Sequence, residues 1–169
     1  MLESFAAWLG GTPLSAFLEN QAWAVPTIQV THILSISVVM AAVAILNLRV
    51  LGVIERGQSL GTLTRRFVPP SIVAILVLAV TGLLMIAAEP NRAIFRYVFW
   101  AKMSLIAVAL VLSAAMLAAL KSSGVWTQPR GAAPAPIKAL AVLGLILWLA
   151  IIVTGRWIGY AQGWPGSPQ

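Results

Sequence analysis

Cysteine is absent from this chain of 169 residues, and histidine occurs once, at His32. Without thiols the protein has no disulfides, thiolate-bound metals, iron–sulfur clusters or covalently attached c-type haem. Charge is also scarce, since 9% of the residues are charged whereas a soluble domain usually carries about 25%. Together with a mean hydropathy of +0.95, this excludes an ordinary water-soluble domain and indicates a protein of the bilayer.

Recognisable reaction motifs are missing as well. The sequence contains no pattern typical of nucleophilic hydrolysis, phosphate binding or dinucleotide binding. The four carboxylates, Glu3, Glu19, Glu55 and Glu89, are too far apart in sequence to indicate an acid–base pair. The net charge of +7 lies in short loops between apolar runs, so it predicts contact with anionic lipid headgroups and no nucleic-acid binding. Whether the protein is an enzyme stays open.

Long apolar runs are what the chain has in abundance. A helix rises about 1.5 Å per residue, so roughly 20 apolar residues cross a bilayer. We therefore predict an all-α fold, a four-helix integral membrane bundle with a short N-terminal amphipathic helix. The membrane domain is expected over residues 21–160, with spans at about 25–51, 68–88, 97–120 and 137–160. The pair Pro69–Pro70 is expected to open the second span.

The remaining segments are predicted from their composition. Residues 1–20 place Leu2, Phe5 and Leu9 on one helical face, which is typical of an amphipathic segment lying at the membrane interface. The linker 121–138 is rich in glycine, serine and proline and predicts an irregular, mobile loop, and residues 161–169 predict a flexible tail.

Basic residues predict the orientation, because loops rich in lysine and arginine face the cytoplasm. The loops after the first and third spans hold seven of the eleven basic residues, namely Arg49, Arg56, Arg65, Arg66, Lys121, Arg130 and Lys138. Both termini are therefore predicted to lie outside. We expect a multi-pass protein of a bacterial inner membrane, in contact with lipid, with its termini in the periplasm.

Polar residues within the spans form the most informative pattern. His32, Lys102 and Arg156 lie roughly 9, 8 and 6 Å from the outer ends of three different spans. Charged or titratable groups in the bilayer are costly unless they have a partner or a function. We predict that they meet in one site in the outer leaflet. In the alternative, Lys102 and Arg156 reach the headgroups, and His32 makes an ordinary hydrogen bond between helices.

The hypothetical cofactor site has His32 as axial metal ligand, Lys102 as second ligand or proton partner, and Arg156 as a clamp for an anionic group. Its other members are a second arginine for haem propionates, a polar neighbour of His32 on its helix and an aromatic wall: Arg96, Gln29 and Trp100. One histidine cannot supply both ligands of a bis-histidine haem b. A haem would therefore need Lys102, a methionine, a single axial ligand or a homodimer sharing the cofactor.

Several other functions remain open at this point. Copper(I) binding by His32 and a methionine sulfur is an alternative, since thioethers suit that ion. A quinone pocket is compatible with the same residues. A further alternative is a non-catalytic subunit or scaffold for a periplasmic or respiratory partner, in a homodimer or a larger membrane complex.

A resemblance to an uncharacterised family of small bacterial four-span membrane proteins is carried by VPTIQVTHILSISVV, NLRVLG, RRFVPPSIVAILVLAVTGLLM, FRYVFWAKMSLIAVAL and LWLAIIVTGRWIGY. More distantly, the first three spans are similar to HemJ-type protoporphyrinogen oxidase and the CopD membrane domain. The matching positions are His32, Arg49, Arg65, Arg66, Pro70, Gly82, Trp100 and Lys102. This resemblance implies that His32 and Lys102 serve haem binding. Because the oxidase's further histidines are absent, it implies a tetrapyrrole site rather than protoporphyrinogen oxidation.

Overall fold

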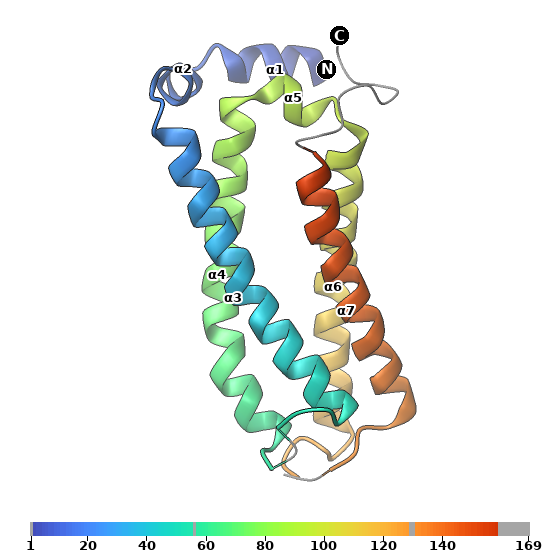
Figure 1. The fold of residues 1–169 in the computed structure, drawn as a ribbon. Coiled ribbons are helices and arrows are strands. Elements are labelled where there is room, and N and C mark those ends of the chain that lie inside the picture. Colours follow the sequence, from blue (N-terminus) through green and yellow to red (C-terminus); the bar gives the residue numbers. More distant parts are fainter. Residues whose placement is uncertain (1, 56, 129–130, 159–169) are drawn as a thin grey trace.

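The computed structural model describes residues 2–55, 57–128 and 131–158, and over these residues the protein is all-helical (Figure 1). Four helices are long and apolar enough to cross a membrane: α3 (Ala24–Leu51), α4 (Leu60–Ala88), α6 (Tyr97–Ser122) and α7 (Ala135–Trp157). The predicted all-α fold with four membrane spans is therefore confirmed.

Three short helices lie across one end of the bundle: α1 (Leu2–Gly10), α2 (Pro13–Asn20) and α5 (Pro90–Ile94). We call this the capped end and the opposite end, with the α3–α4 and α6–α7 loops, the loop end. The start of α1 and the last turn of α7 both lie at the capped end (Figure 1). The N-terminal segment is thus two helices rather than one, because Thr12 caps α2 by accepting a hydrogen bond from the Ser15 N–H at 3.3 Å.

The second span begins about two turns earlier than the sequence suggested. Ser59 caps α4 and accepts from the Thr62 N–H at 3.1 Å, so the helix starts at Leu60 and continues through Pro69 and Pro70. Leu60 and Leu63 are almost fully buried, and their packing favours the extra turns despite the two prolines. Helix α5 was not expected at all. Residues 159–169, with the expected end of the fourth span and the tail, lie outside the described residues.

The long helices form two pairs, α3 with α4 and α6 with α7, and the two pairs are joined where α3 packs against α7. Within the described residues, the backbones of α4 and α6 do not come into close contact. Three apolar clusters follow one another along the bundle. The capped-end cluster is Leu18, Ala24, Ala87 and Ala88; the middle cluster is Val39, Ala74, Ala109, Trp148 and Ile151; the loop-end cluster is Val50, Leu60, Met116, Leu120, Val125, Ala133, Ile137 and Ala141.

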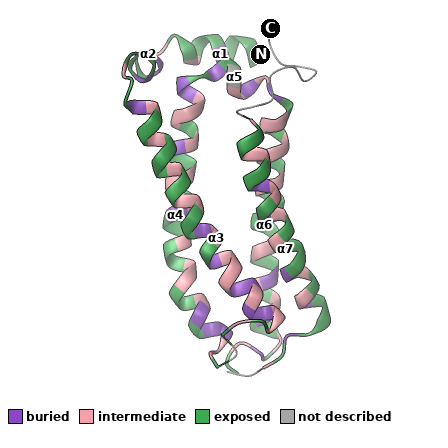
Figure 2. Cartoon of the chain, viewed as in Figure 1, coloured by how far each residue is buried: buried purple, intermediate pink, exposed green. Residues whose placement is uncertain are grey.

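Large apolar side chains are exposed along the long helices. Figure 2 shows how exposed residues are distributed over these helices. Leu34, Leu76 and Val111 are exposed by 63%, 62% and 71%. A continuous apolar exterior of this extent is stable only in contact with lipid or another apolar surface. The protein is therefore a multi-pass membrane protein.

The α6–α7 linker, expected to be irregular and mobile, is packed against the helices where it is described. Val125 and Ala133 belong to the loop-end cluster, and the Gly61 N–H donates to the Trp126 carbonyl at 2.9 Å. Lys121 lies over the Trp126 ring, 5.6 Å from its centroid. The linker is irregular in its backbone, but these contacts hold it to the start of α4.

Gly61→Ala is expected to destabilise the loop end by about 1–3 kcal/mol, the usual cost of overpacking. A Cβ at this position would lie 2.8 Å from Trp126 Nε1 and 3.1 Å from the Trp126 carbonyl oxygen, so the linker would have to move. Thermal unfolding in detergent measures the loss. Gly57→Ala is the control, because a Cβ there meets nothing within 4 Å. Equal midpoints for Gly61→Ala and the wild type would contradict this prediction.

Candidate functional site

A polar layer lies between the middle cluster and the capped end. Each long helix contributes one residue to this layer. Along its helix, that residue is separated by about two turns, roughly 10 Å, from a residue of the middle cluster. The pairs are His32 and Val39 on α3, Thr81 and Ala74 on α4, Lys102 and Ala109 on α6, and Gly155 and Trp148 on α7. We use "polar layer" for His32, Thr81, Lys102 and the adjoining glycines Gly82 and Gly155.

His32 is fixed by a contact to the neighbouring helix. Its ring is partly buried, and Nδ1 lies 2.8 Å from Thr81 Oγ1 on α4. The Thr81 hydroxyl itself donates to the Val77 carbonyl oxygen at 2.7 Å. Gly82 lies beside the ring, since a Cβ there would be 3.8 Å from His32 Cε1. The histidine therefore packs against α4 through a buried threonine and a residue without a side chain.

Lys102 enters the same layer from the other helix pair. Its side chain is partly buried and lies along Gly155 of α7, where a Cβ would be 3.3 Å from Nζ and 3.4 Å from Cε. A side chain at 155 would press on the lysine stem, so glycine leaves it room. Lys102 also lies close enough to His32 to interact with its ring electrostatically. The structure thus places two of the predicted site residues in one layer, on helices from different pairs.

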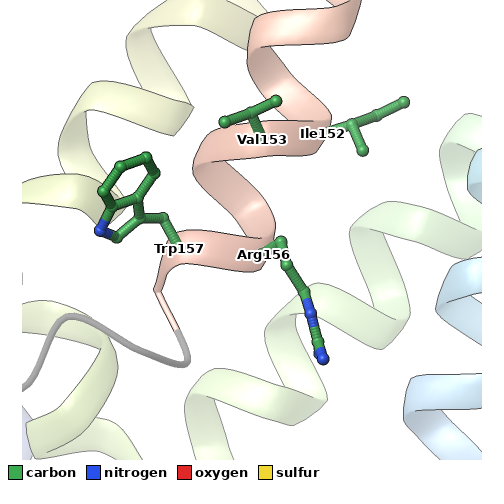
Figure 3. Close-up of a pocket in the computed structure, with 4 residues that line it drawn as sticks. All are labelled: Ile152, Val153, Arg156 and Trp157. Atoms are coloured by element: carbon green, nitrogen blue, oxygen red, sulfur yellow. The ribbon is translucent and has the colours of Figure 1, made fainter.

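Arg156 lies farther out, at the last turn of α7. It lines a shallow open hollow of about 460 Å³ with Ile152, Val153 and Trp157. In Figure 3 the Arg156 side chain extends away from Val153 and Trp157. Arg156 is an exposed residue at the capped end, and it directly follows Gly155, on which Lys102 lies. Arg156 therefore borders the polar layer on its capped side.

Arg96 and Trp100 are occupied by backbone contacts. Arg96 is 8% exposed, precedes α6 and donates through Nη1 to the Ile158 carbonyl at the end of α7. A cation at a helix C-terminus is favourable because the helix dipole is negative there. Trp100 donates its indole N–H to the Ile94 carbonyl at 2.9 Å and closes the α5–α6 connection. Arg96 Nε is buried and has no hydrogen-bond partner among the described residues, and the expected roles in propionate pairing and ring stacking stay predictions.

Gln29 is exposed on α3, whereas His32, three residues later, is partly buried. The polar neighbour that we expected for His32 on this helix is therefore exposed. Thr31 is exposed too, and its hydroxyl donates to the Thr27 carbonyl of the same helix at 2.9 Å. Gln29 is not part of the polar layer.

Thr81 is the site residue that the sequence analysis missed. It is 6% exposed and touches His32 directly. Its position seven residues before the end of α4 gives it the same depth as His32 and Lys102, so a comparison of depths that included hydroxyls would have found it. Threonine escapes notice because in a membrane helix its hydroxyl commonly bonds its own backbone.

In the described part of the chain, no group of three or more His, Asp or Glu side chains is placed to hold a bare metal ion. A porphyrin differs, because it brings four nitrogen ligands of its own and needs only one or two from the protein.

Residues 21–161 match the model of a family described as "Family of unknown function (DUF6644)". The chain belongs to the DUF6644 family. The matched range contains all four long helices and the polar layer, and it begins directly after α2. No match was found among curated proteins or among solved structures. The prediction that the chain belongs to a family of unknown function is confirmed. The description of the DUF6644 family names no ligand and no reaction.

Proposed function

We propose that this membrane protein binds haem b in the polar layer, with His32 as an axial ligand. The observation that carries the proposal is the contact between His32 Nδ1 and Thr81 Oγ1. Haem would supply one-electron transfer within the membrane. The protein residues would hold, orient and electrostatically tune that group.

The proton on His32 can be assigned from the hydrogen bonds around Thr81. A threonine hydroxyl has one proton to donate, and Thr81 donates it to the Val77 carbonyl at 2.7 Å. We infer that Thr81 Oγ1 accepts at the 2.8 Å contact and that His32 Nδ1–H donates. A neutral ring in this tautomer keeps its lone pair on Nε2. A metal-binding histidine typically has this arrangement, with one ring nitrogen held by a hydrogen bond and the other free to ligate.

Apolar clusters lie on both sides of the layer along the bundle, which suits the apolar body of a porphyrin. The middle cluster bounds the layer on one side and the capped-end cluster on the other. Between the two helix pairs, the backbones of α4 and α6 do not approach closely within the described residues. His32 belongs to the α3–α4 pair and Lys102 to the α6–α7 pair. The two proposed ligands of the haem would therefore come from different helix pairs.

The remaining roles in the proposal follow from position. Lys102 is the candidate second ligand or proton partner, because it lies in the layer and acts on His32 electrostatically. Arg156 is the candidate partner of an anionic group such as a propionate, because it borders the layer at the capped end. A homodimer sharing the cofactor, or assembly in a larger membrane complex, would instead supply the second ligand from outside the chain.

Haem uptake tests the proposal directly. Protein purified in detergent and incubated with haemin is expected to give a new Soret band at a fixed stoichiometry. One haem per chain indicates ligands from one chain, and one haem per two chains indicates a shared site. A colourless preparation that takes up no haemin would overturn the proposed function.

Thr81→Val is expected to lower the affinity for haemin by roughly 10–100-fold, the usual cost of losing the group that orients a metal-binding histidine. Thr64→Val is the matched control, because Thr64 lies on the same helix and donates to the Leu60 carbonyl at 2.8 Å in the same way. Haemin titration followed by absorbance measures both variants. Equal affinities for the two would show that the Thr81 contact does not orient the ligand.

We also propose that the capped end faces the periplasm of a bacterial inner membrane. The loop end carries the exposed cations Arg65, Arg66 and Lys121, which favour the cytoplasmic side. Because the chain has no cysteine, single cysteines report the topology without background. A membrane-impermeant maleimide is expected to label Asn20→Cys in intact cells and Ser122→Cys only after permeabilisation. The reverse pattern would invert the proposed orientation.

A further inference from the structure

Two buried polar atoms in the bundle, on the loop-end side of the polar layer, have no hydrogen-bond partner within residues 2–55, 57–128 and 131–158. They are Asn47 Oδ1 on α3 and Trp148 Nε1 on α7. Both residues are more than nine-tenths buried, with exposed fractions of 5% and 8%. Unpaired buried polar atoms are rare in native proteins, because burial removes their hydrogen bonds to solvent.

The side chain of Asn47 is oriented from both sides. Its Nδ2 donates to the Val43 carbonyl on its own helix at 2.7 Å. Its Oδ1 lies against α7, where a Cβ on Gly144 would be 3.4 Å away. Trp148 follows Gly144 by one helical turn on the same face of α7. Asn47 and Trp148 therefore lie within about one helical turn of each other along the seam between α3 and α7.

The two atoms are chemically complementary. An amide oxygen only accepts hydrogen bonds, and an indole N–H only donates them. A water molecule can donate to the first and accept from the second, and the glycine at 144 leaves space beside the amide oxygen. We propose that a water molecule is bound in the α3–α7 seam, donating to Asn47 Oδ1 and accepting from Trp148 Nε1.

This water site is independent of the haem proposal. Trp148 belongs to the middle cluster, which separates Asn47 from the polar layer. Its position suggests what the water does, because α3 against α7 is the contact that joins the two helix pairs. A hydrogen-bonded bridge across this seam fixes how the pairs are rotated relative to each other, as polar contacts do between membrane helices.

Nuclear magnetic resonance of ¹⁵N-labelled protein in detergent micelles tests the site. The indole N–H resonance of Trp148 is identified as the one missing from Trp148→Phe. In the wild type it is expected to show a cross-peak to a long-lived bound water. Asn47→Leu, which removes the acceptor at similar volume, is expected to weaken this cross-peak and to move the indole proton upfield.

Two further variants sharpen the comparison. Gly144→Ala places a methyl group beside Asn47 Oδ1 and is expected to reduce the water cross-peak even if Asn47→Leu does not fold. Asn20→Leu is the matched control: Asn20 is exposed, its Nδ2 donates to the Ala16 carbonyl at 2.8 Å, and both signals are expected to stay unchanged.

Two results would overturn the water site. An indole proton that shifts in Asn47→Leu but shows no water cross-peak in the wild type indicates a direct bond between the side chains. An indole proton with neither response indicates a dry, unpaired seam.

Discussion

His32→Ala is expected to lower the affinity for haemin by more than about 100-fold, since losing only the orienting group of a ligand already costs roughly 10–100-fold. Within the described residues, His32 is the one imidazole that can ligate, because the whole chain contains a single histidine. The ring is partly buried and rests on Gly82, so its removal leaves a small space without displacing a neighbour. Haemin titration followed by the Soret band measures the loss.

The matched control is Gln29→Ala, one turn away on the exposed side of the same helix. It is expected to bind haemin like the wild type. Added imidazole is expected to restore a Soret band to His32→Ala, because it can enter the space that the side chain left. If His32→Ala binds haemin as tightly as the wild type, His32 is not the ligand, even if the protein takes up haem.

The fold was largely predictable because its cause is simple. Four apolar runs are long enough to cross a membrane, and such runs have few alternatives to a membrane helix. Loops with charged residues mark where one run ends and the next begins. The start of α4 was not predictable from the same reasoning. The rule that proline opens a helix placed the start at Pro69–Pro70, but burial of Leu60 and Leu63 at the loop end outweighs it.

The site was predicted in part. Counting residues from the helix ends placed His32 and Lys102 at one depth, and both lie in the polar layer. Depth says nothing about which face of a helix a residue occupies. It therefore could not predict that Gln29 is exposed. Nor does it identify partners: the Ile158 carbonyl that binds Arg96 comes from a helix 62 residues away in sequence.

Arg96→Met is expected to lower the free energy of unfolding by about 2 kcal/mol, in the range for a hydrogen bond to a charged group. Arg96 is 8% exposed and donates to the Ile158 carbonyl, linking the start of α6 to the end of α7. Methionine keeps most of the buried volume but leaves this carbonyl without its cation, at the helix end where positive charge is favourable. Thermal unfolding in detergent measures the change.

Two comparisons separate this structural role from a role in haem binding. Arg65→Met removes the same charge from an exposed position on α4, and its stability is expected to stay within about 0.5 kcal/mol of the wild type. Below its unfolding temperature, Arg96→Met is expected to bind haemin with wild-type affinity, because Arg96 Nη1 already donates to the backbone of α7. Weaker haemin binding at unchanged stability would reverse the assignment and make Arg96 a partner of the propionates.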